Sequence, residues 1–219
     1  MMKKKAFIFD LDGVIVDTAK YHFMAWQKLA DKLDIVFTPE HNEQLKGVSR
    51  VRSLEIILEL GKIQASEEEK QLWLTQKNQD YLSYIEKMDK SEILPNVKEV
   101  LEFIKDRKQP IALGSASKNA RPILEKVGLL PFFDVIIDGN DVSNAKPDPE
   151  VFVRAAKLLG IDNENAVVFE DSLAGIEAAN IAGMLSIGIG DSKVLKHANY
   201  CFPNLLHMDL NFIETIIKN

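Results

Sequence analysis

The sequence predicts an α/β fold: a mostly parallel central sheet flanked by helices, with an α-helical cap domain inserted after the first strand. The apolar run at 6–9 is typical of a strand buried on both faces. Between about residues 19 and 90 only helical periodicity appears. From Pro95 onward, short apolar strands alternate with helices, which is typical of a parallel sheet covered on both faces.

Because the first strand precedes the helical stretch, these helices are an insertion and not a separate upstream domain. We expect a core domain of residues 1–17 and 92–219 and a cap domain of residues 18–91. The chain crosses between them at Asp17 and Thr18 and again at 91–95. We expect the hinge at these two crossings.

The cap elements follow from helical spacing and capping signals. Residues 20–33 carry Phe23 and Trp26 on one apolar stripe, and Thr38 caps a helix with Pro39 at its first position. A further helical period surrounds residues 54–58 and closes at Gly61. Ser66 and Glu69 form a capping box that opens a long helix through about Met88.

The core elements are short apolar runs, each followed by a helix. Glycines close several of the helices, as is common at helix C-termini. The expected strands are 6–9, 111–114, 133–137, 166–169 and 185–189, and the expected helices are 97–107, 119–127, 149–159, 173–182 and 210–218.

Composition excludes several classes of function. The 219 residues are 46% hydrophobic and 27% charged with a net charge of −6, which is ordinary for a soluble domain and argues against a general nucleic-acid binder. The single cysteine, Cys201, fits a reducing compartment. The basic start at 1–5 is followed by aspartates and no cleavage site, so it is not a signal peptide. No apolar run reaches the ~20 residues of a membrane span. We expect a cytoplasmic monomer that contacts neither membrane nor nucleic acid.

The first strand ends in two acids with an i, i+2 spacing. In extended backbone Asp10 and Asp12 face the same side, and Gly13 lets the chain turn. Two such carboxylates repel each other unless a metal ion or a difference in protonation keeps them together. A strand followed by an ordinary Asp-Gly turn is the simpler alternative for this stretch alone.

Other polar side chains follow the later strands. Ser115 and the residues up to Asn119 come at a helix N-terminus, which suits a phosphate. Lys146 follows the third strand, and Glu170 and Asp171 follow the fourth. Ligands of open parallel sheets bind at the carboxyl ends of the strands, and carboxylates with a phosphate are ligands that Mg²⁺ prefers.

Each of these side chains also has a structural explanation. Ser115 can cap its helix, Lys146 can be a solvated loop lysine, and the acidic pair can favour a helix dipole. Separate structural explanations of this kind do not account for the presence of such residues at four strand ends at once.

These residues resemble the four motifs of the haloacid dehalogenase-like phosphotransferases, and the resemblance spans essentially the whole chain with a Rossmann-like core. It implies Asp10 as nucleophile and Asp12 as general acid/base. One Mg²⁺ would be held by Asp10, the Asp12 backbone carbonyl, Glu170 and Asp171. Ser115, Ala116 and Lys146 would bind the transferring phosphoryl group.

The cap motifs resemble the β-phosphoglucomutase group of that superfamily. The resemblance implies interconversion of β-D-glucose 1-phosphate and glucose 6-phosphate through glucose 1,6-bisphosphate. Arg50, Ser117, Lys118 and Asn119 would hold the distal phosphate. The implied cap contacts to the sugar are His22, Trp26, Lys46, Gly47, Val48, Ser49, Ser53 and Lys77. From its stripe alone Trp26 is better explained as core, and His22 as a surface or capping residue.

Two alternatives remain open at this point. A phosphatase of small phosphorylated sugars would use the same residues with water as acceptor. A non-catalytic phosphosugar-binding protein would have no use for a nucleophile beside a metal, so the intact Asp10 and Asp12 pair counts against it.

Overall fold

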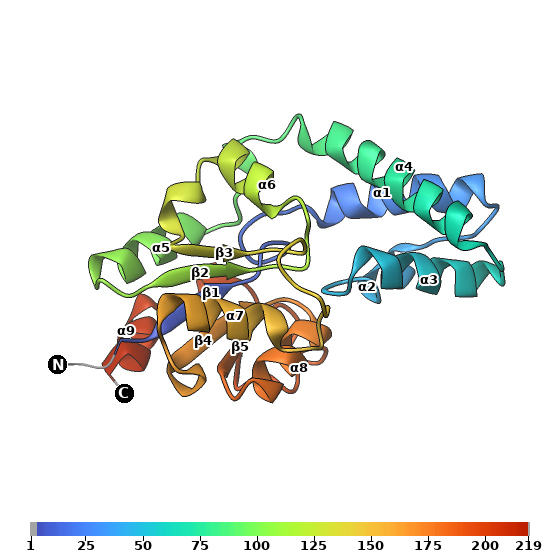
Figure 1. Ribbon diagram of the computed structural model, residues 1–219. Coiled ribbons are helices and arrows are strands. Elements are labelled where there is room, and N and C mark those ends of the chain that lie inside the picture. Colours follow the sequence, from blue (N-terminus) through green and yellow to red (C-terminus); the bar gives the residue numbers. More distant parts are fainter. Residues whose placement is uncertain (1–3, 219) are drawn as a thin grey trace.

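The computed structural model describes residues 4–218 and shows a parallel sheet with a helical segment beside it (Figure 1). The basic start at Met1 to Lys3, and Asn219 at the end of the expected core domain, lie outside the described residues. Within 4–218, six parallel strands pair in the order β3-β2-β1-β4-β5-β6. The strands are β1 (Ala6–Phe9), β2 (Ile111–Gly114), β3 (Val135–Ile137), β4 (Ala166–Glu170), β5 (Leu185–Ile189) and β6 (Tyr200–Phe202).

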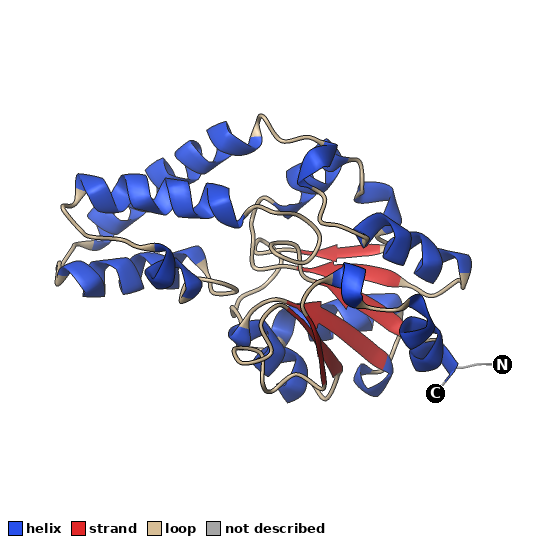
Figure 2. Ribbon diagram, turned by 180° about the vertical axis from the view of Figure 1, so that it is seen from behind, coloured by secondary structure: helices blue, strands red, loops and turns tan. Residues whose placement is uncertain are grey.

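Helices cover both faces of the sheet (Figure 2). Side chains of β1 alternate between the faces, so Phe7 and Phe9 pack in one hydrophobic cluster and Ala6 and Ile8 in another. The first cluster is closed by α5 (Val97–Asp106), α6 (Ala120–Val127) and α9 (Leu210–Lys218), and the second by α7 (Glu150–Leu159) and α8 (Leu173–Ile181).

The helical segment between β1 and α5 has a hydrophobic cluster of its own. Trp26, Leu54 and Leu74, from three different helices, are buried together there. Ser66 caps the longest helix through a capping box, as expected. The helices are α1 (Ala19–Lys32), α2 (Pro39–Glu43), α3 (Arg50–Gly61) and α4 (Glu67–Ile85).

The two linkers between the helical segment and the sheet run side by side. Asp17 N donates to Glu92 O (2.9 Å), and Leu94 N donates to Ile15 O (3.0 Å). Val16 forms an isolated β-bridge with Ile93. The expected hinge segments are therefore neighbours, and motion about them stays a prediction.

Several details differ from the sequence-based expectations. The strand β6 was not expected, and β3 begins at Val135 and not at 133 because Leu130–Phe132 forms a 3₁₀ turn (η2). The remaining short turns are η1 (Lys90–Glu92), η3 (Asn163–Asn165) and η4 (Leu205–His207). In the part of the chain that the structure describes, no helix combines the length and apolarity that a membrane crossing needs.

Candidate active site

The register of the sheet brings three strand ends to one rim. Phe9 pairs with Leu113 of β2 and with Phe169 of β4. The next residue, Asp10, therefore lies level with the ends of both neighbouring strands, beside Glu170. Asp10, which follows β1, and Glu170, which ends β4, meet at this rim, as expected for a parallel sheet.

Lys146 joins these two acids. Its Nζ lies 2.5 Å from Asp10 Oδ1 and 2.6 Å from Glu170 Oε1, and 4.7 Å from the centre of the Phe152 ring. The lysine side chain is 1% exposed. Burial lowers the pKa of Lys146, but the two carboxylates outweigh it, so this pKa lies above its ordinary value. Lys146 is thus a buried cation of the site and not a solvated loop lysine.

The two aspartates after β1 have different surroundings. Burial raises the pKa of Asp10 to about 7; Lys146 opposes the shift, and Glu170 and Asp12 add to it. Burial also raises the pKa of Asp12, against a hydrogen bond from the Thr18 hydroxyl to Asp12 Oδ1. Asp12 Oδ2 lies 3.9 Å from His22 Nε2. Asp10 therefore faces a cation, while Asp12 faces a hydroxyl and an imidazole.

The two acids at the end of β4, Glu170 and Asp171, have different surroundings. Glu170 is fully buried, and its second oxygen accepts from the backbone N (2.7 Å) and Oγ (2.9 Å) of Ser172. Asp171 lines the cavity, 3.9 Å from Lys46 Nζ. Burial raises the pKa of Asp171 well above its ordinary value, and Glu170 and Asp10 raise it further. Both oxygens of Glu170 are engaged, whereas Asp171 stands towards the cavity.

The donor set fits Mg²⁺ in part. Within residues 4–218, no three His, Cys, Asp or Glu side chains gather closely enough to hold a metal ion, so the expected ligands are not preassembled. Asp10 and Asp171 nevertheless line one cavity, and the pKa of each is raised, first by burial and then by the neighbouring carboxylates. Mg²⁺ commonly takes one or two protein carboxylates and completes its shell with phosphate and water oxygens. These two aspartates fit that arrangement.

A loop after β2 lies at the same rim, and its own serine hydroxyls hold its backbone in shape. Ser115 Oγ accepts from Ser117 N (3.1 Å), and Ser117 Oγ accepts from Asn119 N (3.2 Å). The Asn119 amide donates to Asn78 Oδ1 of α4 (3.1 Å). This last bond joins the phosphate-binding candidate loop directly to the helical segment.

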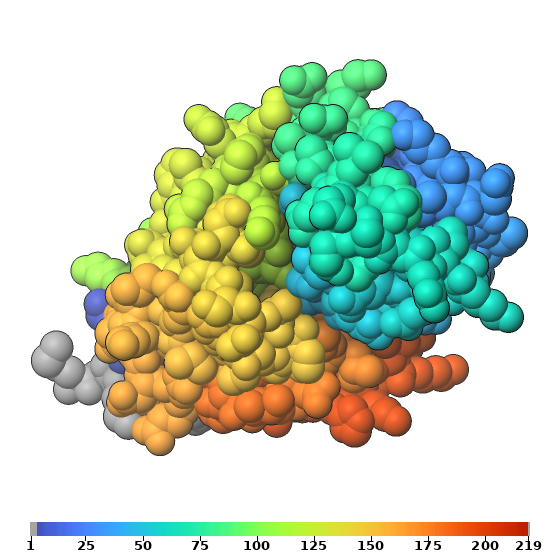
Figure 3. Space-filling model, turned by 45° about the vertical axis from the view of Figure 1, so that its right-hand side comes forward, coloured from blue at the N-terminus to red at the C-terminus, as the bar shows by residue number. Residues whose placement is uncertain are grey.

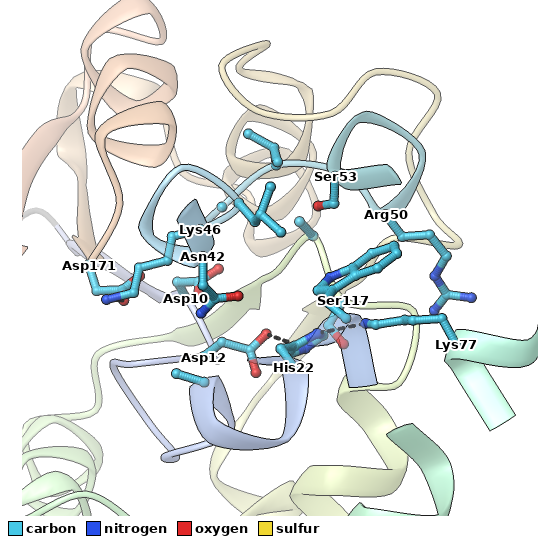
Figure 4. A pocket seen from close by; sticks show the side chains of 16 residues that line it. Asp10, Asp12, His22, Asn42, Lys46, Arg50, Ser53, Lys77, Ser117 and Asp171 are labelled. Atoms are coloured by element: carbon cyan, nitrogen blue, oxygen red, sulfur yellow. Dashed lines mark hydrogen bonds and ion pairs between the residues drawn. The ribbon is translucent and has the colours of Figure 1, made fainter. Parts of the chain in front are cut away.

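The helical segment contributes a buried basic group opposite the aspartates (Figure 4). Lys77 Nζ lies 3.0 Å from His22 Nδ1 and 4.4 Å from the centre of the Trp26 ring. Lys77 is 3% exposed, and burial lowers its pKa to about 7, with Arg50 adding to the shift. Burial, Lys77 and Arg50 also lower the pKa of His22 well below its ordinary value. Trp26 belongs to the hydrophobic cluster of the helical segment and also lines the cavity.

Arg50 lies where two cavities meet. Within residues 4–218 its guanidinium makes no hydrogen bond or ion pair. It lines a cavity of about 90 Å³ with the aspartates and an adjoining cavity of about 760 Å³ with Lys118. The space-filling view shows a groove between the teal helices and the yellow part of the chain (Figure 3). Arg50 is thus a cation available to an anionic ligand.

Most of the predicted site residues line one of these cavities. Asn119, Glu170 and Thr18 line neither, and Asp17 lies at the linker. The smaller cavity holds Asp10, Asp12, His22, Trp26, Lys46, Gly47, Val48, Arg50, Ser53, Lys77, Ala116, Ser117 and Asp171, and the larger holds Ser49, Ser115, Lys118 and Lys146.

The structure adds cavity residues that the sequence did not indicate. Asn42 and Leu45 reach the smaller cavity from the region of α2, and Ala19 from the start of α1. Gly47 approaches the core so closely that a Cβ there would overlap the Ser172 hydroxyl. An isolated asparagine on a short helix, or a leucine just after it, carries no spacing signal that points to a ligand.

Known proteins resemble this chain over most of its length. The sequence matches the haloacid dehalogenase-like hydrolase family over residues 4–183. It is 40% identical to a β-phosphoglucomutase of Bacillus subtilis over 89% of this chain and 87% of that protein. It is 32% identical to a phosphorylated carbohydrates phosphatase of Thermotoga maritima, over 89% and 91%.

A solved structure is similar over almost the whole length. The crystal structure of a β-phosphoglucomutase from Clostridium difficile is 43% identical, with a TM-score of 0.93 over 98% of this chain and 97% of that one. Sequence match, strand order and the grouping of acids and lysine at the sheet rim agree with one another. The chain therefore belongs to the haloacid dehalogenase-like hydrolase family.

Proposed function

We propose that this protein is a Mg²⁺-dependent β-phosphoglucomutase that interconverts β-D-glucose 1-phosphate and glucose 6-phosphate through β-glucose 1,6-bisphosphate. One observation carries the proposal: two cationic side chains, Lys146 beside Asp10 and Arg50 on α3, line the same larger cavity. A bisphosphate needs two anion sites. The similar β-phosphoglucomutases support the same function.

Asp10 acts as the nucleophile. Its phosphorylated carboxylate transfers the phosphoryl group to the C6 hydroxyl of β-glucose 1-phosphate, which gives the bisphosphate. After the bisphosphate has turned around, an Asp10 oxygen attacks the C1 phosphorus and the bond from phosphorus to the C1 oxygen breaks, which releases glucose 6-phosphate. A covalent carboxyl intermediate divides one difficult transfer into two easier ones.

Asp12 moves the proton in both halves. It accepts the proton of the C6 hydroxyl in the first transfer and donates it to the C1 oxygen in the second. Burial raises the pKa of Asp12 above its ordinary value, which is the direction that suits a group that accepts and donates a proton. The Thr18 hydroxyl and His22 orient its two oxygens.

The remaining residues bind and orient. Ser115, the Ala116 N–H and Lys146 hold the transferring phosphoryl group, and Arg50 with Ser117, Lys118 and Asn119 holds the distal phosphate, where a guanidinium can form two parallel bonds. A bound Mg²⁺, held by Asp10 and Asp171 with the Asp12 carbonyl, would neutralise charge on the phosphoryl oxygens. Glu170 keeps Lys146 in place beside Asp10.

The cap decides the acceptor. The cavities are lined from the cap by Lys46 to Ser49, Ser53 and Lys77. When the cap closes on a sugar phosphate, these residues keep water away from the aspartyl phosphate. Thr18 and Asp17 would act as the hinge, between a core domain of 1–17 and 92–219 and a cap of 18–91. We propose that the enzyme works as a cytoplasmic monomer with no nucleic-acid or membrane partner.

A sugar-phosphate phosphatase is the second candidate, because a relative 32% identical is named a phosphorylated carbohydrates phosphatase. The two differ only in whether water or a sugar hydroxyl receives the phosphoryl group. The unpaired Arg50 favours the mutase, since a phosphatase needs only one anion site.

The product of β-glucose 1-phosphate separates the two candidates. With Mg²⁺ and catalytic glucose 1,6-bisphosphate, the protein should form glucose 6-phosphate far faster than free phosphate, and the α-anomer serves as the specificity control. Asp10→Asn should abolish both products, because no nucleophile remains. Dominant phosphate release from the wild type would refute the mutase.

A further inference from the structure

Glu92 binds the first turn of α1 from the second linker. Its Oε2 lies 2.6 Å from Lys20 Nζ, and its Oε1 accepts from the Tyr21 hydroxyl at 2.6 Å. The Glu92 side chain is only 13% exposed. The two carboxylate oxygens of Glu92 thus accept hydrogen bonds from two consecutive residues of α1.

The same residue also joins the linkers through its backbone. Its carbonyl oxygen accepts from Asp17 N, the residue before the α1 cap. The Tyr21 ring packs against the main hydrophobic cluster of the core. Glu92 therefore holds the start of α1 at three points, two of them through its side chain.

This first turn leads directly to the proposed acid/base. Thr18 precedes α1 and is fully buried, and its carbonyl oxygen accepts from Tyr21 N (3.0 Å) and His22 N (3.1 Å). The Thr18 hydroxyl donates to Asp12. A displacement of Tyr21 would therefore move Thr18 and His22, the two groups that orient the Asp12 carboxylate.

We propose that Glu92 is a positioning residue that ties the two linkers together. When the cap moves, this tie keeps the hydrogen bond from the Thr18 hydroxyl to Asp12 intact. The expected effect on the reaction rests on the proposed function. Without the tie, the Asp12 carboxylate is oriented less firmly at the moment when the sugar hydroxyl attacks. Water then takes a larger share of the phosphoryl groups. Glu92 touches neither substrate nor reacting atoms.

A carboxylate suits this task better than a neutral group. Burial raises the pKa of Glu92, but the hydrogen bonds from Lys20 and Tyr21 outweigh it and leave this pKa below its ordinary value. Hydrogen bonds to an ionised acceptor are stronger than neutral ones. Exposed ion pairs alone contribute little, so the partly buried Tyr21 contact carries the tie.

The test compares Glu92→Gln with Lys28→Met. Lys28 Nζ lies 2.6 Å from Asp80 Oδ1, which gives an α1 lysine paired at the same distance but wholly inside the cap. Glu92→Gln should raise the ratio of phosphate release to glucose 6-phosphate formation about tenfold, the effect of losing one charge-assisted hydrogen bond. Tyr21→Phe should raise it in the same direction, and Lys28→Met should leave it unchanged.

Hydrogen exchange of the linker amides tests the tie without any substrate. In Glu92→Gln the amides of Asp17 and Leu94, which are bonded across the linkers, should exchange faster than in the wild type, and in Lys28→Met they should not. If the wild type forms no glucose 6-phosphate, the proposed function is wrong while the exchange result still decides the tie. The inference would be overturned if Glu92→Gln kept both the product ratio and the amide exchange rates of the wild type. It would also be overturned if Lys28→Met raised the product ratio as much as Glu92→Gln does.

Discussion

Lys77 is a basic side chain that the helical segment holds away from water. Its pKa of about 7 in the folded protein lies below the 10.5 of a free lysine, mainly because of burial. Between these two pH values the unfolded chain binds more protons than the folded protein. The free energy of unfolding should therefore rise with pH across this window, by up to about 1.4 kcal/mol per pH unit.

Replacing Lys77 by methionine should remove that dependence. Lys77→Met keeps the length and the contact with Trp26 but carries no proton to titrate, so its unfolding free energy should exceed that of the wild type most at pH 7 and least near pH 10. Urea titrations at several pH values measure the difference in slope. Lys87→Met, an exposed change in the same segment, is the control; equal slopes in all three proteins would contradict the assignment.

Gly47 combines a backbone constraint with a steric one. Its φ is +71°, and a Cβ would overlap the Ser172 hydroxyl across the cleft. Gly183 has nearly the same φ, +70°, with no atom within 4 Å of a Cβ. Both alanine variants should therefore lose about 1 kcal/mol of stability from the left-handed backbone.

Only Gly47→Ala should impair formation of glucose 6-phosphate, by about tenfold or more, because only there does the new methyl push the cap loop from the core. Thermal unfolding and the product assay measure the two effects separately. Equal loss of activity in Gly183→Ala would mean that backbone strain, and not the contact with Ser172, is responsible.

At the scale of residues, the coincidence of acids and a lysine at several strand ends pointed to the core site, and the resemblance of the cap motifs supplied the other candidates. The sequence did not place Lys77 on His22, since such a pair depends on two helices that meet in three dimensions. Asn42 was missed because an isolated asparagine on a short helix is more often exposed than a ligand. Glu170 was expected to bind the metal. Its hydrogen bonds from Lys146 and Ser172 could not be read from the sequence, because they depend on the fold.

At the scale of elements, α4 depends on its capping box. The Ser66 hydroxyl accepts from Glu69 N (3.3 Å), and Ser66 N donates to the Glu69 carboxylate (2.8 Å). Ser66→Ala should lower the free energy of unfolding by about 1 kcal/mol. The helix carries Lys77 eleven residues further on, so the rate of the mutase at saturating substrate should change little. Ser66→Asp, which restores an acceptor at the cap, should recover the stability.

The elements that were predicted well carry local signals. The uniformly buried strands β1 and β2 have apolar runs, and α2 and α4 have capping residues. The strand β6 has no such signal, because Tyr200–Phe202 is three residues long and is defined by its pairing with Ile187 to Ile189. The start of β3 shifted because Phe133 N bonds back to Leu130 O (3.3 Å) and closes the 3₁₀ turn instead of joining the sheet.

At the scale of the whole molecule, the site is divided between the sheet and the helical segment. Arg50 and Arg52 lie two residues apart on α3, but Arg50 faces the cavities and Arg52 pairs with Glu55 (3.1 Å) and Glu59 (2.9 Å). Arg50→Ala should reduce formation of glucose 6-phosphate about 100-fold or more, because a charge-assisted contact to the distal phosphate is lost.

The same change should affect hydrolysis of a small aryl phosphate much less, because that substrate has no distal phosphate to bind. Arg52→Ala should alter neither reaction by more than about twofold. Steady-state kinetics with both substrates give the comparison. Parallel losses on the two substrates in Arg50→Ala would place the guanidinium at the transferring phosphoryl group instead.

The insertion of the helical segment was evident from the sequence, whereas its approach to the core was not. The Asn119 to Asn78 bond and the contact of Gly47 with Ser172 join residues that are far apart in the chain. No periodicity or capping signal encodes such contacts, because each depends on how two separately packed clusters meet.

The position of β1 has a consequence for synthesis of the chain. It is made first, yet it lies in the middle of the sheet and pairs with β2 from residue 111 and with β4 from residue 166. Helices form from local contacts, whereas distant strand pairing is slow. The helical segment can therefore fold on the ribosome while the apolar strand Ala6–Phe9 still lacks both neighbours, and an unpaired apolar strand is open to aggregation.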